Sequence, residues 1–143
     1  MISRLLLLLA ALFAGLPVSL ALADDMVIVT AKSSAIEVIT QDEAAKLYLG
    51  RTTTLADNTS VTLIDLPPGA ERDRFYQALT GKNPVQIRAN WSRQVFTGRA
   101  LPPRQADSLE QLRDWLLSDE RSIGYMPASG LGDGLRPLLV IGR

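Results

Sequence analysis

The segment from residue 64 to residue 75 contains the side chains best suited to binding chemistry. An apolar strand is predicted to run into a Pro-Pro-Gly turn at residues 67–69 and then into a helix whose first turn carries Arg72. The first N–H groups of a helix have no partner inside it, and together with the helix dipole they attract anions. Arg72 can bind a phosphate or carboxylate through two parallel hydrogen bonds. The pattern predicts an oxyanion site at Gly69, Ala70, Glu71 and Arg72.

The same pattern also fits a turn that binds nothing. Glycine is common where a strand passes into a helix, because it lets the backbone turn tightly. Glu71 lies in the first turn of the predicted helix, so its carboxylate can itself be the anion that satisfies the helix dipole. Both interpretations stay open on the sequence alone.

A second polar loop follows the first predicted strand. It contains Ser33 and Ser34, whose hydroxyl groups can donate hydrogen bonds to an anion. Serines in such loops also cap turns, which is the alternative here. These two serines complete the set of candidate binding residues.

The chain lacks the usual equipment of an enzyme. It contains no histidine and no cysteine, which removes the most common general base, the most common metal ligand and the familiar nucleophile–base pairs. A serine–lysine pair would need Lys32, Lys46 or Lys82, and none of them lies in a recognisable motif. We therefore expect a non-enzymatic protein with no catalytic residue, no metal site and no cofactor.

Strands and helices alternate along the sequence. Short apolar runs predict strands at residues 26–30, 60–66, 122–126 and 137–141. Capping residues Thr40, Asn83 and Ser108 predict helix starts, a further helix is expected at residues 70–79, and residues 97–106 read as a loop. Ile87, Trp91 and Val95 form an apolar stripe at helical spacing. This order predicts an α/β fold with a mostly parallel central sheet flanked by helices, whose ligands would lie at the carboxyl ends of the strands.

Residues 1–23 have the order of a secretory signal peptide. A basic residue at position 4 precedes the apolar run 5–14, a break at Gly15 and Pro17, and the small residues Ala21 and Ala23. Cleavage after Ala23 would remove 23 of 143 residues and leave residues 24–143, a single domain of 120 residues. The alternative is a retained anchor, although a spanning helix needs roughly 20 apolar residues. We expect export to the periplasm.

Charge is unevenly distributed along the chain. Residues 72–104 hold seven basic residues and one acidic residue, a net charge of +6, whereas residues 24–71 carry a net charge of −5 and residues 105–143 a net charge of −2. A basic middle segment suits an anionic ligand or an acidic partner. It also fits helices whose arginines simply extend into solvent. The near-zero total charge argues against nucleic acid as a partner.

Three stretches carry a resemblance to a known family: residues 41–51, the Trp…Phe-Thr-Gly…Pro-Pro run at 90–103, and the Ile-Gly-Tyr strand at 122–126. They resemble the phosphate-binding periplasmic solute receptors that serve ATP-driven phosphate importers. The resemblance implies one lobe of a type II periplasmic binding protein, with phosphate or a related oxyanion as ligand. The family's Gly-Ser-Gly-Thr-Arg turn corresponds to residues 68–72, where the glycine and arginine match and Ala70 and Glu71 replace the hydroxyl donors.

The chain also departs from that family in its length. Full-length receptors are about twice as long, and their amino-terminal phosphate loop is missing unless Ser33 and Ser34 replace it. Two hypotheses follow. The chain is an exported solute-binding protein for an ABC importer, or it is a single-lobe interaction module without a small ligand. Such a module would dock on a membrane sensor, on a transporter permease, or on a second copy of itself as a homodimer.

Overall fold

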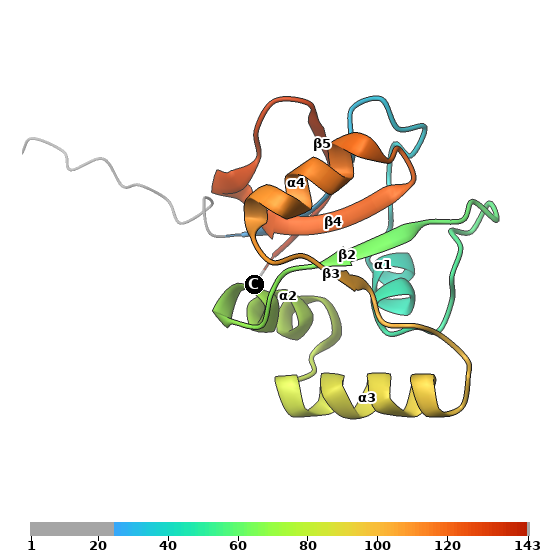
Figure 1. Ribbon diagram of the computed structural model, residues 1–143. Coiled ribbons are helices and arrows are strands. Elements are labelled where there is room, and N and C mark those ends of the chain that lie inside the picture. The colour runs from blue at the N-terminus through green and yellow to red at the C-terminus, as the bar shows by residue number, and fades with distance from the viewer. Residues whose placement is uncertain (1–24, 143) are drawn as a thin grey trace, which may run out of the picture.

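The computed structural model describes residues 25–142 as a mixed α/β fold built on one five-stranded sheet (Figure 1). The predicted signal peptide, residues 1–23, lies outside the described residues. Within residues 25–142 no helix is long and apolar enough to cross a membrane. The sheet has the order β3-β2-β4-β1-β5. Its strands are β1 (Met26–Ala31), β2 (Thr62–Asp65), β3 (Arg104–Gln105), β4 (Ser122–Pro127) and β5 (Leu135–Ile141).

Four α-helices and a short 3₁₀ turn surround the sheet. Figure 1 shows α4 on one side of the sheet and α2 on the other, with α3 beyond α2. All four helices were predicted from the sequence, as were all the strands except β3, which lies in the segment expected to be a loop. The helices are α1 (Gln41–Tyr48), α2 (Ala70–Thr80), α3 (Pro84–Phe96) and α4 (Leu109–Ser118), and the turn is η2 (Ala128–Gly130).

The sheet is mixed rather than simply parallel. β2 pairs in parallel with both β3 and β4, whereas β1 pairs antiparallel with both β4 and β5. Four strands therefore run in one direction, and β1 runs against them from a position inside the sheet. The α/β class is confirmed, but the reversed strand was not foreseen. Every residue of β1 is buried, so its sequence lacks the alternation that marks an antiparallel strand with one solvent face.

Side-chain caps fix the starts of three helices. Thr40 and Glu43 form a capping box at α1, Asn83 and Gln86 form another at α3, and the Ser108 hydroxyl accepts a hydrogen bond at α4. These bonds satisfy backbone N–H groups that the helix leaves unpaired. The predicted helix starts are confirmed because capping is a local interaction within four residues.

A buried aromatic cluster lies between the sheet and α2. The rings of Phe75 and Tyr125 stack with centroids 3.5 Å apart, and Tyr48 and Tyr76 meet them edge to face. The Tyr48 hydroxyl donates to the backbone carbonyls of Ile64 and Ile123. The cluster joins α1, α2, β2 and β4 around the carboxyl end of β2, where the candidate site lies.

The apolar stripe on α3 is only partly buried. Ile87 and Trp91 are buried as predicted, but Val95 is 47% exposed. The prediction for Val95 is wrong because the buried face of α3 is centred on Ile87, Asn90 and Trp91, and Val95 lies at its edge, where it lines an open groove. Trp115 on α4 is half-buried and is covered by the guanidinium of Arg104, which lies 3.5 Å from its ring centroid.

Candidate functional site

The amino terminus of α2 is open to solvent and lacks a side-chain cap. Gly69 precedes the helix in an extended conformation, and it accepts the first helical hydrogen bond from the N–H of Asp73 at 3.0 Å. The preceding N–H groups, those of Ala70, Glu71 and Arg72, are the ones a helix leaves without internal partners. A side chain added at Gly69 would come no closer than 4.0 Å to the Pro67 carbonyl oxygen. The space beside the Cα atom of Gly69 is therefore open.

Arg72 is already engaged on one side. Its Nη2 lies 3.4 Å from Oδ2 of Asp65, and its Nη1 donates to the Gln105 side chain at 3.4 Å. The guanidinium also lies 5.8 Å from the ring centroid of Tyr76. The sequence had suggested an arginine free to clamp a ligand. The structure shows one whose position is fixed by β2 and β3, with 21% of its side chain still exposed.

Asp65 forms the buried floor of the site. The residue is 2% exposed, and its carboxylate accepts hydrogen bonds from Tyr125 at 2.5 Å and from Tyr76 at 2.9 Å. Burial raises the pKa of the Asp65 carboxyl, because water no longer stabilises the charged form; Arg72 and the two tyrosine hydroxyls act in the opposite direction. Three side chains from two elements, α2 and β4, thus hold one carboxylate, which in turn orients Arg72.

The two tyrosines act as neutral donors. Burial raises the pKa of Tyr76 and of Tyr125, and the nearby Asp65 charge raises both further. The Tyr125 hydroxyl also accepts a hydrogen bond from the Leu66 N–H at 3.2 Å. These hydroxyls therefore remain protonated and hold the carboxylate in place.

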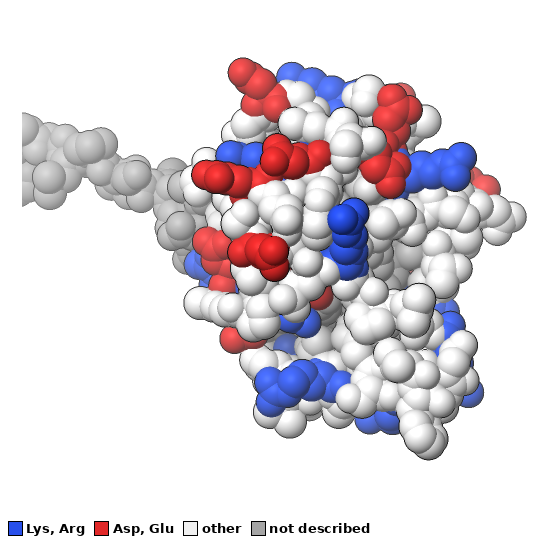
Figure 2. Space-filling model, viewed as in Figure 1, with Lys and Arg blue, Asp and Glu red and all other residues white. Residues whose placement is uncertain are grey.

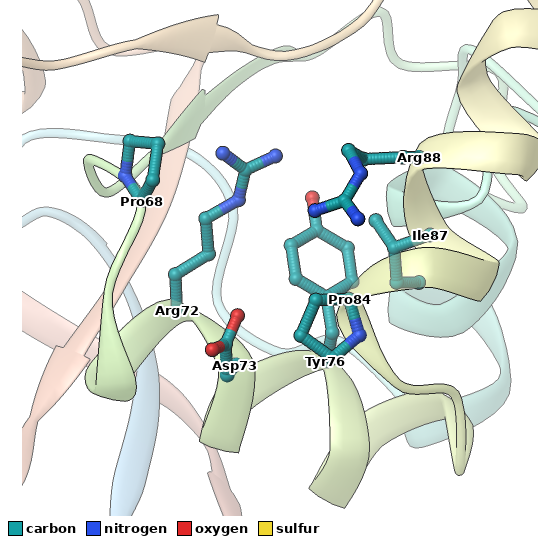
Figure 3. Close-up of a pocket in the computed structure, with 7 residues that line it drawn as sticks. All are labelled: Pro68, Arg72, Asp73, Tyr76, Pro84, Ile87 and Arg88. Carbon is teal, nitrogen blue, oxygen red and sulfur yellow. The ribbon is translucent and has the colours of Figure 1, made fainter.

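A pocket of about 110 Å³ opens between α2 and α3 (Figure 3). Arg72 from α2 and Arg88 from α3 both reach into it, and the Tyr76 ring lies between them. Its volume is several times the space that one water molecule needs, which suits a small oxyanion. The pocket is lined by Pro68, Arg72, Asp73, Tyr76, Pro84, Ile87 and Arg88.

A larger groove of about 580 Å³ continues from this pocket along α3. The two share Arg72, Ile87 and Arg88, and the groove extends to the Pro102–Pro103 segment beside β3. Its floor includes Trp91, which is 7% exposed. The site is thus a polar end, at Arg72 and Arg88, opening into a mostly apolar channel.

Charges in the pocket balance. The two arginines face the carboxylates of Asp65 and Asp73, so these four groups sum to zero at neutral pH. Glu71 is exposed and forms no ion pair in the part of the chain that the structure describes. An anion here would be held by the directed N–H donors of the two guanidinium groups rather than by an excess of positive charge.

Ser33 and Ser34 lie far from this pocket along the strand direction. The Thr30 hydroxyl bonds to the carbonyl of Ser122, at the first residue of β4, so the carboxyl end of β1 lies where β4 begins. Gly69 follows the carboxyl end of β2, which runs parallel to β4. The antiparallel direction of β1 therefore puts the two predicted halves of the site at opposite ends of the sheet.

The two serines have local roles instead. The Ser34 hydroxyl accepts a hydrogen bond from the N–H of Ile36 at 3.1 Å, and Ser34 is buried. Arg136 donates to the backbone carbonyls of Lys32, Ser34 and Ile36, which fastens the loop to β5. We correct the prediction: one oxyanion site cannot include these serines together with Gly69, Ala70, Glu71 and Arg72.

Sequence reasoning missed four contributors to the site: Asp73, Tyr76 and Arg88, which line the pocket, and Asp65, which pairs with Arg72 and lines the groove. Arg88 comes from a different helix, and nothing local marks it among the seven basic residues of its segment. Asp65 is an acidic residue at the end of an apolar strand, which is an unusual placement and the one signal that pointed to it. In residues 25–142 no three acidic side chains group into a possible metal site, and the chain has no histidine or cysteine.

Comparison with solved structures gives the same fold. The chain is similar to a protein from Clostridium perfringens described as a phosphate ABC transporter substrate-binding protein with bound phosphate, at a TM-score of 0.62 and 16% identity over 82% of this chain. It is also similar to an ABC-type phosphate transport receptor from Vibrio cholerae, at 0.61 and 12% over 82%. A third neighbour, from Planctomyces limnophilus and described as a phosphate-binding protein, matches at 0.59 and 12% over 80%.

These similarities establish the fold and stop there. The chain spans 45%, 46% and 40% of the three neighbours, so it corresponds to less than half of each. No protein-family model matches the chain, and no curated protein matches it. The expectation of a lobe like those of solute-binding proteins is confirmed at the level of the fold.

Proposed function

We propose that this chain is a non-enzymatic solute-binding protein that takes phosphate or a related oxyanion at the amino terminus of α2. The observation that carries the proposal is the meeting of Arg72, from the uncapped first turn of α2, and Arg88, from α3, at one small pocket (Figure 3). Backbone N–H groups and guanidinium donors are the groups that bind oxyanions elsewhere in proteins. The pocket also lies beyond the carboxyl end of β2, where open α/β sheets bind ligands.

The similarity to phosphate receptors supports the ligand class. The neighbour from Clostridium perfringens has phosphate bound, and the one from Vibrio cholerae is a transport receptor. This chain spans less than half of either protein. A single lobe covers less of its ligand than a closed pocket does, so we expect a dissociation constant above that of a two-lobed receptor.

Export and a membrane partner belong to the same proposal. The order of residues 1–23 is that of a signal peptide, which would deliver residues 24–143 to the periplasm. There the protein would present its ligand to the permease of an ABC importer or to a membrane sensor. The composition supports a binding role over catalysis, since the chain has neither histidine nor cysteine.

Thermal unfolding with added anions tests the ligand. The chain from residue 24 onward, which contains the whole described fold, is heated with inorganic phosphate, with sulfate, and with chloride at matched ionic strength. At 100 times its dissociation constant, phosphate should add about 2.7 kcal/mol to the free energy of unfolding, which raises the melting temperature by roughly 10 °C. An equal shift with sulfate and phosphate would contradict phosphate selectivity, and no shift with either would contradict the oxyanion proposal.

Substitutions at Gly69 test where phosphate binds. Gly69→Asp puts a carboxylate at the helix start, where it would cap α2 and occupy the anion's position. Calorimetric titration with phosphate should then show binding lost while the protein stays folded. Gly69→Ala is the matched control, because its methyl group meets open space and leaves the N–H groups free. Equal phosphate affinity in both variants would move the site elsewhere.

The charge balance gives a second test of the same pocket. Asp73→Asn removes one carboxylate from the pocket wall while keeping the size of the side chain. Phosphate affinity should rise several-fold, because one repulsive charge is gone. Asp42→Asn, which alters an exposed carboxylate on α1, should leave the affinity unchanged.

A further inference from the structure

One side of α3 exposes large apolar side chains. Val85 is 64% exposed, Val95 47% and Phe96 93%, and they share a helix face with Arg88 and Ser92. We call these five residues the α3 face. Leu101, 83% exposed, follows in the next loop. An almost fully exposed phenylalanine places a large apolar area in contact with water. Apolar surface patches bordered by charged residues mark contact surfaces.

The segment that carries this face has charge of one sign. Residues 82–106 contain five basic residues and no acidic residue. Contact surfaces rich in arginine and aromatic side chains are typical of protein–protein interfaces. The occupant should therefore offer carboxylates beside an apolar side chain.

The chain itself contains a surface of that kind on α4. Glu110, Asp114 and Leu117 follow one another at four and three residues, so they lie on one side of the helix. All three are exposed, Leu117 by 52%. Residues 107–120 hold five acidic residues and one basic residue. We call Glu110, Asp114 and Leu117 the α4 face.

The two faces match in spacing. Arg88 precedes Val95 by seven residues, and Glu110 precedes Leu117 by seven residues. Both intervals cover about 10.5 Å along a helix. Two helices that run in the same direction can thus set Arg88 against Glu110 and Val95 against Leu117 together.

The arrangement of the helices permits this contact twice between two copies. In Figure 1, α3 lies at the bottom and α4 at the top, and both run from left to right. Figure 2 shows most of the acidic side chains in the upper and left parts of the same view, with basic side chains among them, and a largely uncharged surface bordered by basic side chains in the lower part. A twofold axis running horizontally in front of this face would set α3 of each copy against α4 of the other, with the helices parallel.

We propose that this protein forms a twofold-symmetric dimer in which the α3 face of each copy binds the α4 face of the other. The contact is isologous, so each pair of opposite charges occurs twice. It rests on surface residues outside the oxyanion-binding N–H groups, with Arg88 shared between the two. The dimer would also place a second copy over the groove that continues from the pocket, where a lone lobe leaves its ligand open.

Sedimentation equilibrium of the chain from residue 24 onward tests the dimer. Dimer should form at micromolar concentrations and weaken as salt rises from about 0.05 M to about 0.5 M, because the paired charges are screened. Phe96→Ser should weaken it by about tenfold or more, with unchanged far-ultraviolet circular dichroism because Phe96 supports no core contact. If the protein remained monomeric at every concentration up to about 100 μM, the proposal would be overturned.

A charge swap tests the pairing. Arg88→Glu and Glu110→Lys should each abolish the dimer, since each replaces two attractions with two repulsions. Mixing the two variants should restore it as a heterodimer, and a chain carrying both substitutions should dimerise with itself. Glu37→Lys, an exposed reversal in the segment between β1 and α1, is the control and should dimerise normally. A dimer that survives both single reversals, or a mixture that fails to associate, would overturn the proposal.

Phosphate binding is measured in an experiment separate from the measurement of the dimer. Glu110→Lys alters neither the pocket nor the groove that continues from it, so phosphate titration of this variant reports the oxyanion site in the absence of the dimer. Loss of the dimer with retained phosphate binding, or the reverse, separates the failure of one proposal from that of the other.

Discussion

Arg72 Nη2 lies 3.4 Å from the buried carboxylate of Asp65, so the arginine that faces the candidate pocket also neutralises a charge inside the fold. Asp65 is 2% exposed, whereas 21% of the Arg72 side chain remains exposed. The pair therefore links the stability of the domain to the geometry of the site. Arg88, on the other wall, is exposed and makes no ion pair within residues 25–142.

Replacing the two arginines should have different consequences. Arg72→Ala leaves the Asp65 carboxylate without its cation, and the free energy of unfolding should fall by about 2 kcal/mol, less than for a fully dry pair because water reaches Arg72. Arg88→Ala should change it by less than about 0.5 kcal/mol. Urea denaturation of the two variants measures both values. If the two variants proved equally stable, the Arg72–Asp65 ion pair would contribute nothing measurable to the free energy of unfolding.

The tyrosines around Asp65 should also differ from each other. The Tyr125 hydroxyl both donates to Asp65 and accepts from the Leu66 N–H, whereas the Tyr76 hydroxyl donates only to Asp65. Tyr125→Phe leaves two buried groups short of a partner and should cost about 3 kcal/mol of unfolding free energy, against about 1.5 kcal/mol for Tyr76→Phe. Chemical denaturation of both variants gives the order. The reverse order would contradict the role assigned to Tyr125.

Lowering the pH should remove part of the free-energy cost of burying the Asp65 carboxylate. Because the folded pKa of Asp65 lies above its ordinary value of 3.8, the folded state takes up a proton more readily than the unfolded chain. The contribution of Asp65 to stability is therefore fully present below that ordinary value and is lost as the pH rises through the folded pKa. Asp65→Asn should cost less stability at pH 7 than at about pH 4.

Denaturant curves of the wild type and Asp65→Asn across that range measure this difference. Glu43 works in the opposite sense, because backbone hydrogen bonds from Thr40 and Ala56 lower its pKa below 4.5. Its contribution is present above that value and is lost as the pH falls. Glu43 is common to both proteins, so it cancels in the comparison. A cost that grew with rising pH would mean that Asp65 is stabilised as the anion.

Two glycines offer a matched pair for the packing of α3. Gly50 and Gly81 both end helices with φ near +71° and +72°, so alanine costs about 1 kcal/mol at either from the backbone alone. A methyl group at Gly50 would lie 2.8 Å from the Trp91 ring, whereas at Gly81 it meets nothing within 4 Å. Gly50→Ala should therefore cost about 2 kcal/mol more than Gly81→Ala in thermal unfolding. Equal losses of stability in the two variants would mean that the Trp91 ring moves aside at no cost in free energy.

Local features of the fold followed from the sequence. Helix starts at Thr40, Asn83 and Ser108 were predicted because a cap and its partner lie within four residues. β3 was missed because two residues, Arg104 and Gln105, leave no periodic signal, and they form a strand only by pairing with β2. The exposure of Val95 was missed because helical spacing shows which residues share a face but does not show where the neighbouring layer ends.

The candidate site divides in the same way. The sequence by itself determined the open helix start at Gly69 and the proximity of Arg72, since a turn and the helix that follows it are contiguous. Only the tertiary structure decided that Arg72 pairs with Asp65, that Arg88 enters the same pocket, and that Ser33 and Ser34 do not. The physical reason is strand direction: a buried strand reads the same whichever way it runs, but reversing β1 moves the loop after it to the opposite end of the sheet.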